Sequence, residues 1–109
     1  MTNKKSQTFY LSRSNKPNKK FSVTIDRGEG KRTKTIHFGQ KTASDYTIHK
    51  DEERMKRYVK RHRARENWKI SGVETAGFWS RWLLWNKPSF RASLTDIRNK
   101  FKIKIVNQV

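Results

Sequence analysis

Histidine and aspartate are the residue types in this chain that most readily bind metals or transfer protons. The candidates are His37, Asp45, His49, Asp51 and His62. His49 and Asp51 are one residue apart, but His37 and His62 are distant in sequence, and no HExxH or comparable spacing is present. Cysteine is absent, which excludes a thiolate zinc site and a cysteine nucleophile. We therefore predict no metal, no cofactor and no enzymatic activity. A metal-dependent nuclease using His37, His49 and Asp51 is the third hypothesis, and His62 is expected to be a packed core histidine.

Lysine and arginine point to a different chemistry. The chain has 27 Lys and Arg against 9 Asp and Glu, a formal net charge of +18. The densest group lies within residues 50–66 and consists of Arg54, Lys56, Arg57, Lys60, Arg61, Arg63 and Arg65. Arginine forms bidentate hydrogen bonds with phosphate, so this group is the main predicted nucleic-acid surface. The predicted second surface consists of Lys19, Lys20, Lys31, Arg32 and Lys34. The alternative is a solvated helix face that the acids at 51–53 partly neutralise.

Aromatic residues are concentrated between residues 78 and 85, in the sequence FWSRWLLW. Exposed aromatic rings beside cations can stack on bases or anchor a protein interface. The helical spacing instead places Trp79, Trp82 and Leu83 in a core. Trp85 projects from another side near Arg81, so these two residues are the predicted stacking or interface pair.

Alternating apolar and polar residues predict strands that would hold these groups in place. Residues 21–25 and 33–38 alternate with period two and are separated by a glycine-containing turn at 26–30, which predicts a hairpin. Residues 102–106 alternate again, and we expect them to join the hairpin in a three-stranded antiparallel sheet. Residues 1–20 are predicted to be a basic, partly flexible arm in which residues 9–11 form an edge strand or dock on the core.

Helical periodicity predicts about three helices that cover this sheet. Within residues 50–66, Met55, Tyr58, Val59 and His62 form one apolar stripe, and acids come first and cations last, as the helix dipole favours. Residues 76–85 follow a predicted Thr75 cap, and residues 89–100 repeat the apolar spacing. The prediction is a small α+β domain over residues 21–109.

Length and composition limit the remaining classes. A chain of 109 residues suits one domain. No apolar run approaches the roughly 20 residues of a membrane-spanning helix, and the N-terminal residues lack the apolar core of a secretory signal. We expect a protein that is not secreted.

Several segments resemble a known family. The segments are residues 36–39, 45–51, 57–62, 66–68 and 75–89, with the sequences IHFG, DYTIHKD, RYVKRH, ENW and TAGFWSRWLLWNKPS. Together they are similar to a family of small basic proteins encoded by large double-stranded DNA viruses of algae and protists, over residues 20–101. The resemblance implies a viral origin and a location in the virion, or in the cytoplasm or nucleus of an infected cell. That family has no known activity, so no residue role carries over.

Charge and resemblance together favour a binding protein. The first hypothesis is DNA or RNA binding through phosphates, with a role in genome packaging or condensation. The alternative is a minor capsid or cement protein that contacts other virion proteins. A steep fall of affinity with salt would favour the first, and presence in genome-free shells would favour the second.

Overall fold

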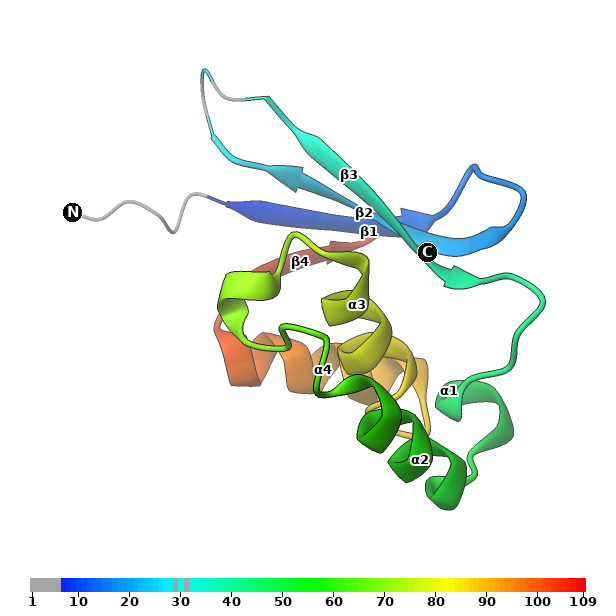
Figure 1. The fold of residues 1–109 in the computed structure, drawn as a ribbon. Coiled ribbons are helices and arrows are strands. Elements are labelled where there is room, and N and C mark those ends of the chain that lie inside the picture. Colours follow the sequence, from blue (N-terminus) through cyan, green and yellow to red (C-terminus); the bar gives the residue numbers. More distant parts are fainter. Residues whose placement is uncertain (1–6, 29, 31) are drawn as a thin grey trace.

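The computed structural model describes residues 7–28, 30 and 32–109. A four-stranded sheet forms one layer, and the helices lie together against one of its faces (Figure 1). This arrangement confirms the predicted small α+β fold. Within the described residues, no helix has the length and apolar character needed to cross a membrane.

The sheet differs from the prediction in its strand order and direction. The strands are β1 (Thr8–Arg13), β2 (Lys19–Asp26), β3 (Lys34–Gln40) and β4 (Lys104–Asn107). Their order is β3-β2-β1-β4, with β1–β2 and β2–β3 antiparallel but β1–β4 parallel. The predicted hairpin is confirmed as β2–β3. The expected three-stranded antiparallel sheet was wrong, because β1 lies between the hairpin and the C-terminal strand.

Strand β1 also corrects the expected arm. Residues 1–6 of the arm lie outside the described residues, but from Thr8 onward the chain is part of the sheet. Phe9 and Leu11 point into the core and are 1% and 0% exposed. They meet Ile25 and Val23 of β2 across the ladder. Burial of these two side chains removes apolar surface from water and so stabilises the fold. The basic composition of residues 1–20 gave no indication that this segment contributes to the core.

The helical layer begins with two helices that follow β3 along the chain. Helix α1 (Tyr46–His49) is capped by Asp45, and α2 (Glu52–His62) is capped by Asp51. The Asp51 carboxylate accepts hydrogen bonds from the backbone N–H groups of Glu53 (3.1 Å) and Arg54 (3.3 Å). Such caps satisfy N–H groups that the first helical turn leaves without partners.

The remaining helices contain most of the aromatic core. They are the 3-10 helix η2 (Ile70–Gly72), α3 (Ala76–Trp79), the π-helix η3 (Ser80–Leu84) that continues it, and α4 (Phe90–Phe101). Thr75 caps α3 as predicted, with its hydroxyl accepting from the Phe78 N–H. Trp79 and Leu83 are fully buried, which confirms the prediction that they belong to the core. Trp82 is partly buried and packs against that core.

Candidate nucleic-acid interface

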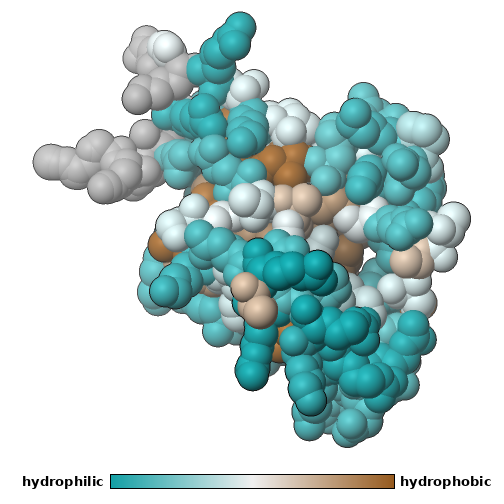
Figure 2. Space-filling view, viewed as in Figure 1, coloured by the Kyte–Doolittle hydropathy of each residue, from teal (hydrophilic) through white to brown (hydrophobic). Residues whose placement is uncertain are grey.

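Helix α2 and the turn that follows it present their cations to solvent: the helix ends at His62, so Arg63 and Arg65 of the predicted helix lie in that turn. Every residue of the main predicted surface is exposed: Arg54, Lys56, Arg57, Lys60, Arg61, Arg63 and Arg65. No side chain of α2 is fully buried. In the space-filling view, a continuous, strongly hydrophilic surface covers this region (Figure 2). The helix is therefore an accessory element on the outside of the fold rather than a core helix.

The helical repeat places three of these cations in one row. Positions separated by three or four residues share a face of an α-helix, so Arg54, Arg57 and Arg61 form one row. The first and last of these are about 10 Å apart at 1.5 Å per residue. A duplex strand carries one phosphate per roughly 3.4 Å of helix axis. The arginine row, defined as Arg54, Arg57 and Arg61, is thus long enough to follow about three successive phosphates.

Little acidic charge opposes this surface. Lys56 lies 3.6 Å from the Glu52 carboxylate, and both side chains are more than 60% exposed. An exposed pair of this kind contributes little to stability and can open when an anion binds. Among the described residues, the arginine row has no ion pair.

The predicted second surface does not form as one surface. Lys19 is at one end of the β2–β3 ladder, paired with Gln40, while Lys34 is at the other end, paired with Ile25. Six residues of strand separate them by roughly 20 Å. Lys34 lies 3.7 Å from Glu74, Arg32 is exposed, and Lys31 lies outside the described residues.

The charge of Lys20 is paired with an acidic residue of the protein itself. Its ammonium group donates a hydrogen bond to the Asp45 carboxylate, and the two side chains are only 12% and 2% exposed. Asp45 also accepts from the backbone N–H (2.9 Å) and the hydroxyl (2.5 Å) of Thr47. Because the paired charges satisfy each other in a place that water hardly reaches, Lys20 is removed from the predicted interface.

Trp85 is stacked within the protein. Its ring lies 4.5 Å from that of Tyr58 with an interplanar angle of 2°, and 5.4 Å from His49. Tyr58 also stacks on Trp68, with ring centroids 6.5 Å apart and an interplanar angle of 15°. These contacts attach α2 to the helical layer. One face of the Trp85 ring is therefore in contact with the protein itself.

Arg81 is an internal cation. It donates a 2.6 Å hydrogen bond to the Trp85 carbonyl oxygen, and its guanidinium lies 4.5 Å from the Trp82 ring and 5.5 Å from the Trp68 ring. Burial lowers its pKa from the usual value, because desolvation disfavours the charged form. These contacts give Arg81 a role in holding the tryptophan segment together.

The three histidines lie in different places. His37 Nδ1 is 2.8 Å from the Ser14 hydroxyl, and His49 Nδ1 accepts from the Asp51 N–H at 2.9 Å. His62 is partly buried on α2, where it lines a cavity instead of belonging to the core. Within the part of the chain that the structure describes, no three His, Asp or Glu side chains are grouped as metal ligands would be.

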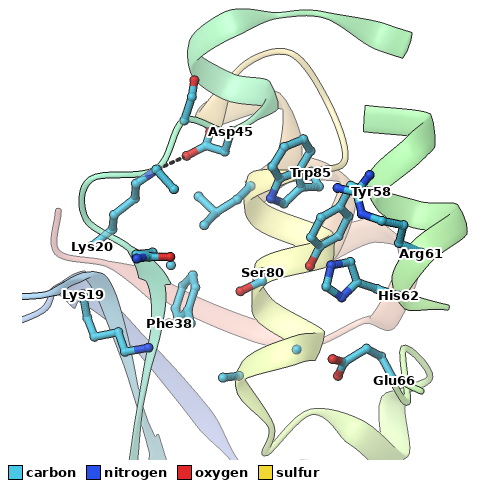
Figure 3. Close-up of a pocket in the computed structure, with 17 residues that line it drawn as sticks. Lys19, Lys20, Phe38, Asp45, Tyr58, Arg61, His62, Glu66, Ser80 and Trp85 are labelled. Atoms are coloured by element: carbon cyan, nitrogen blue, oxygen red, sulfur yellow. Dashed lines mark hydrogen bonds and ion pairs between the residues drawn. The ribbon is translucent and has the colours of Figure 1, made fainter. Parts of the chain in front are cut away.

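That cavity is the feature that the sequence did not reveal. It has a volume of about 540 Å³ and lies between the end of β3, α2 and the α3–η3 segment. Lys19, Arg61, His62, Glu66, Tyr58 and Ser80 contribute polar groups to it, several of which point into the space (Figure 3). Burial, reinforced by the negative charge of Glu66, raises the pKa of Tyr58 to about 12. The phenol is protonated at neutral pH, as it would be at its ordinary pKa of about 10, and can donate a hydrogen bond.

Comparison with known proteins gives one match. The model of a family of unknown function, DUF5754, matches residues 9–62, just under half of the chain. The match begins in β1 and ends at the last residue of α2, so it includes the arginine row and the Lys20–Asp45 pair. No curated protein and no solved structure is significantly similar. The chain is thus similar, from its first described strand through its basic helix, to a family with no assigned function.

Proposed function

We propose that this protein binds nucleic acid through the phosphate backbone, with α2 as the main contact. The observation that supports the proposal most directly is the arginine row, three exposed guanidinium groups on one helix face with no acidic partner among the described residues. The net charge of +18 adds long-range attraction to any polyanion. Contacts of this kind position a protein on DNA or RNA but do not select a sequence. Packaging or condensing a genome requires only such sequence-independent contacts.

A salt titration with matched variants tests the proposal. Affinity for duplex DNA is measured by mobility shift at several salt concentrations for the wild type and for the triple variant R54Q, R57Q, R61Q. Each lost phosphate contact lowers the log–log salt slope by about 0.9, so the triple variant should lose about 2.7 from the slope. The control variant R13Q, R91Q, K104Q loses the same charge at exposed positions elsewhere.

The two variants separate a local interface from general attraction. If α2 is the interface, the control keeps most of the wild-type slope. Equal losses in both variants would mean that net charge alone governs binding and would refute the assignment to α2. A wild-type affinity that does not change with salt would refute the proposed function altogether.

A structural role in a virus particle is the second candidate. The resemblance to proteins of large DNA viruses supports a virion or infected-cell location. The sheet face opposite the helices is accessible to such a contact, because no described helix covers it (Figure 1). That face carries hydroxyl groups, including Thr24 and Thr35, whose oxygens are 3.0 Å apart. A minor capsid or cement protein would remain in stoichiometric amounts in genome-free shells, whereas loss of the protein with the genome would exclude this role.

A further inference from the structure

The cavity beside α2 exists because small residues line it. Gly39, Ala43, Ser44, Ala76, Gly77 and Ser80 come from two separate segments and leave the space unfilled. Gly39 has φ +79, and a Cβ there would lie 2.9 Å from Leu84 Cδ1. At Gly77 a Cβ would lie 1.9 Å from the Glu66 carboxylate. With a volume of about 540 Å³, the cavity is within the range of small-molecule sites.

Its lining combines three kinds of group. Lys19 and Arg61 bring positive charge from opposite walls, one from β2 and one from α2. The Tyr58 and Ser80 hydroxyls, His62 and Glu66 offer both donors and acceptors. Phe38, Leu84 and Trp85 supply apolar surface. In the close-up, Ser80 and Glu66 point into the space from one side and Lys19 lies across from them (Figure 3).

This combination fits a nucleotide better than simpler ligands. Inorganic phosphate would satisfy the cations but would leave Glu66 beside an added negative charge. An apolar ligand would leave the hydroxyls, His62 and Glu66 without partners, which costs free energy. A heteroaromatic base has a flat apolar face and a hydrogen-bonding edge, and its phosphate would lie near the cations at the walls.

Arg61 belongs to both the cavity and the arginine row. We propose that the cavity receives one unpaired base of a single-stranded DNA or RNA whose backbone lies along the arginine row. This inference rests on the proposed function, because α2 must hold the strand. It predicts a preference for single strands, since a base within a duplex is stacked and paired and cannot enter without flipping.

Two variants of matched chemistry test the inference. A43W places a large side chain at the cavity lining, and A92W places the same side chain at an exposed position of α4 outside it. Affinities for a single strand and for a duplex of equal length are measured for both. Losing one inserted base should weaken single-strand binding by about tenfold in A43W. Duplex binding by A43W, and both affinities of A92W, should stay within about twofold of the wild type.

If A43W fails to fold, a second measurement tests the inference. Adenosine monophosphate and, separately, inorganic phosphate are titrated into the isotope-labelled wild type. The nucleotide should shift the amide signals of Gly39, Gly77 and Ser80, and phosphate at equal concentration should not. Unchanged signals with the nucleotide, or equal affinity of the wild type for single strand and duplex, would overturn the inference. Salt-dependent duplex binding that R54Q, R57Q, R61Q weakens would still leave the proposed function standing.

Discussion

Tyr58 is the residue that attaches the basic helix to the rest of the protein. Helix α2 has no fully buried side chain, and its Tyr58 ring is stacked against two residues outside the helix, Trp85 at 4.5 Å and Trp68 at 6.5 Å. Replacing Tyr58 with alanine removes both stacks. We expect α2 to separate locally from the helical layer, while the sheet and the buried aromatic core keep their structure.

The contacts set the size of the effect. Each aromatic pair contributes about 0.5–1.5 kcal/mol beyond burial. The partly buried ring adds about 1–2 kcal/mol at roughly 25 cal/mol per Å² of apolar surface removed from water. Y58A should therefore make local opening of α2 easier by about 3 kcal/mol, or roughly 100-fold. Y58F keeps both stacks, and the Tyr58 hydroxyl has no hydrogen bond among the described residues, so Y58F should differ from the wild type by less than about 0.5 kcal/mol.

Native-state hydrogen exchange measures this opening residue by residue. In Y58A, amides of α2 should exchange roughly 100-fold faster, and amides of β1 and β2 should change far less. Equal acceleration in α2 and in the sheet would refute the reasoning, because it would show that the helix opens only with the whole domain. The anchoring role of the stack would also be refuted by a Y58F variant as perturbed as Y58A.

Three further predictions concern the surroundings of the cavity. Because Tyr58 has a pKa of about 12 in the folded state and about 10 when unfolded, its contribution to stability is constant below pH 10 and is lost as pH rises toward 12. In urea unfolding, the free energy of unfolding should fall between pH 9 and pH 11 by about 1 kcal/mol more in the wild type than in Y58F. G39A should lower the free energy of unfolding by about 1–3 kcal/mol, since φ is +79 and the added Cβ meets Leu84; calorimetry checks this. D45N, which leaves the Lys20 ammonium without its buried partner, should cost about 2–4 kcal/mol in denaturant unfolding, whereas an unchanged midpoint would show that the pair contributes nothing.

Local patterns predicted most elements of the fold but not their assembly. The hairpin, α2 and α4 were recognisable because period-two and period-3.6 patterns are properties of short segments. The direction and position of the first and last strands depend on which partners they meet over long distances, and alternation does not specify this. Phe9 and Leu11 were ambiguous for that reason, since a short apolar stretch among cations suits either an edge strand or a core strand.

The candidate site shows the same division. The cations of α2 were identifiable, because a charged helix face is visible in the sequence. The fate of Lys20 was not, since its partner Asp45 lies 25 residues away and only the folded chain brings them together. The Tyr58–Trp85 stack and the cavity also depend on tertiary contacts. Small residues such as Gly77 and Ser80 carry no signal that marks them as cavity lining until the surrounding elements are placed.

The parallel pairing of β4 with β1 has a consequence for how the protein forms. Thr8 pairs with Lys104 and Leu11 with Asn107, so this ladder closes a loop of about a hundred residues at an entropic cost that nearer pairings avoid. The hairpin and the individual helices can form early from local contacts, but the sheet is complete only when residues 104–107 reach β1. During synthesis, one edge of β1 and the apolar face beneath it must therefore wait for the last part of this segment to emerge. Such non-local pairing slows folding, and a polyanion that binds α2 in this interval would be bound before the sheet is complete.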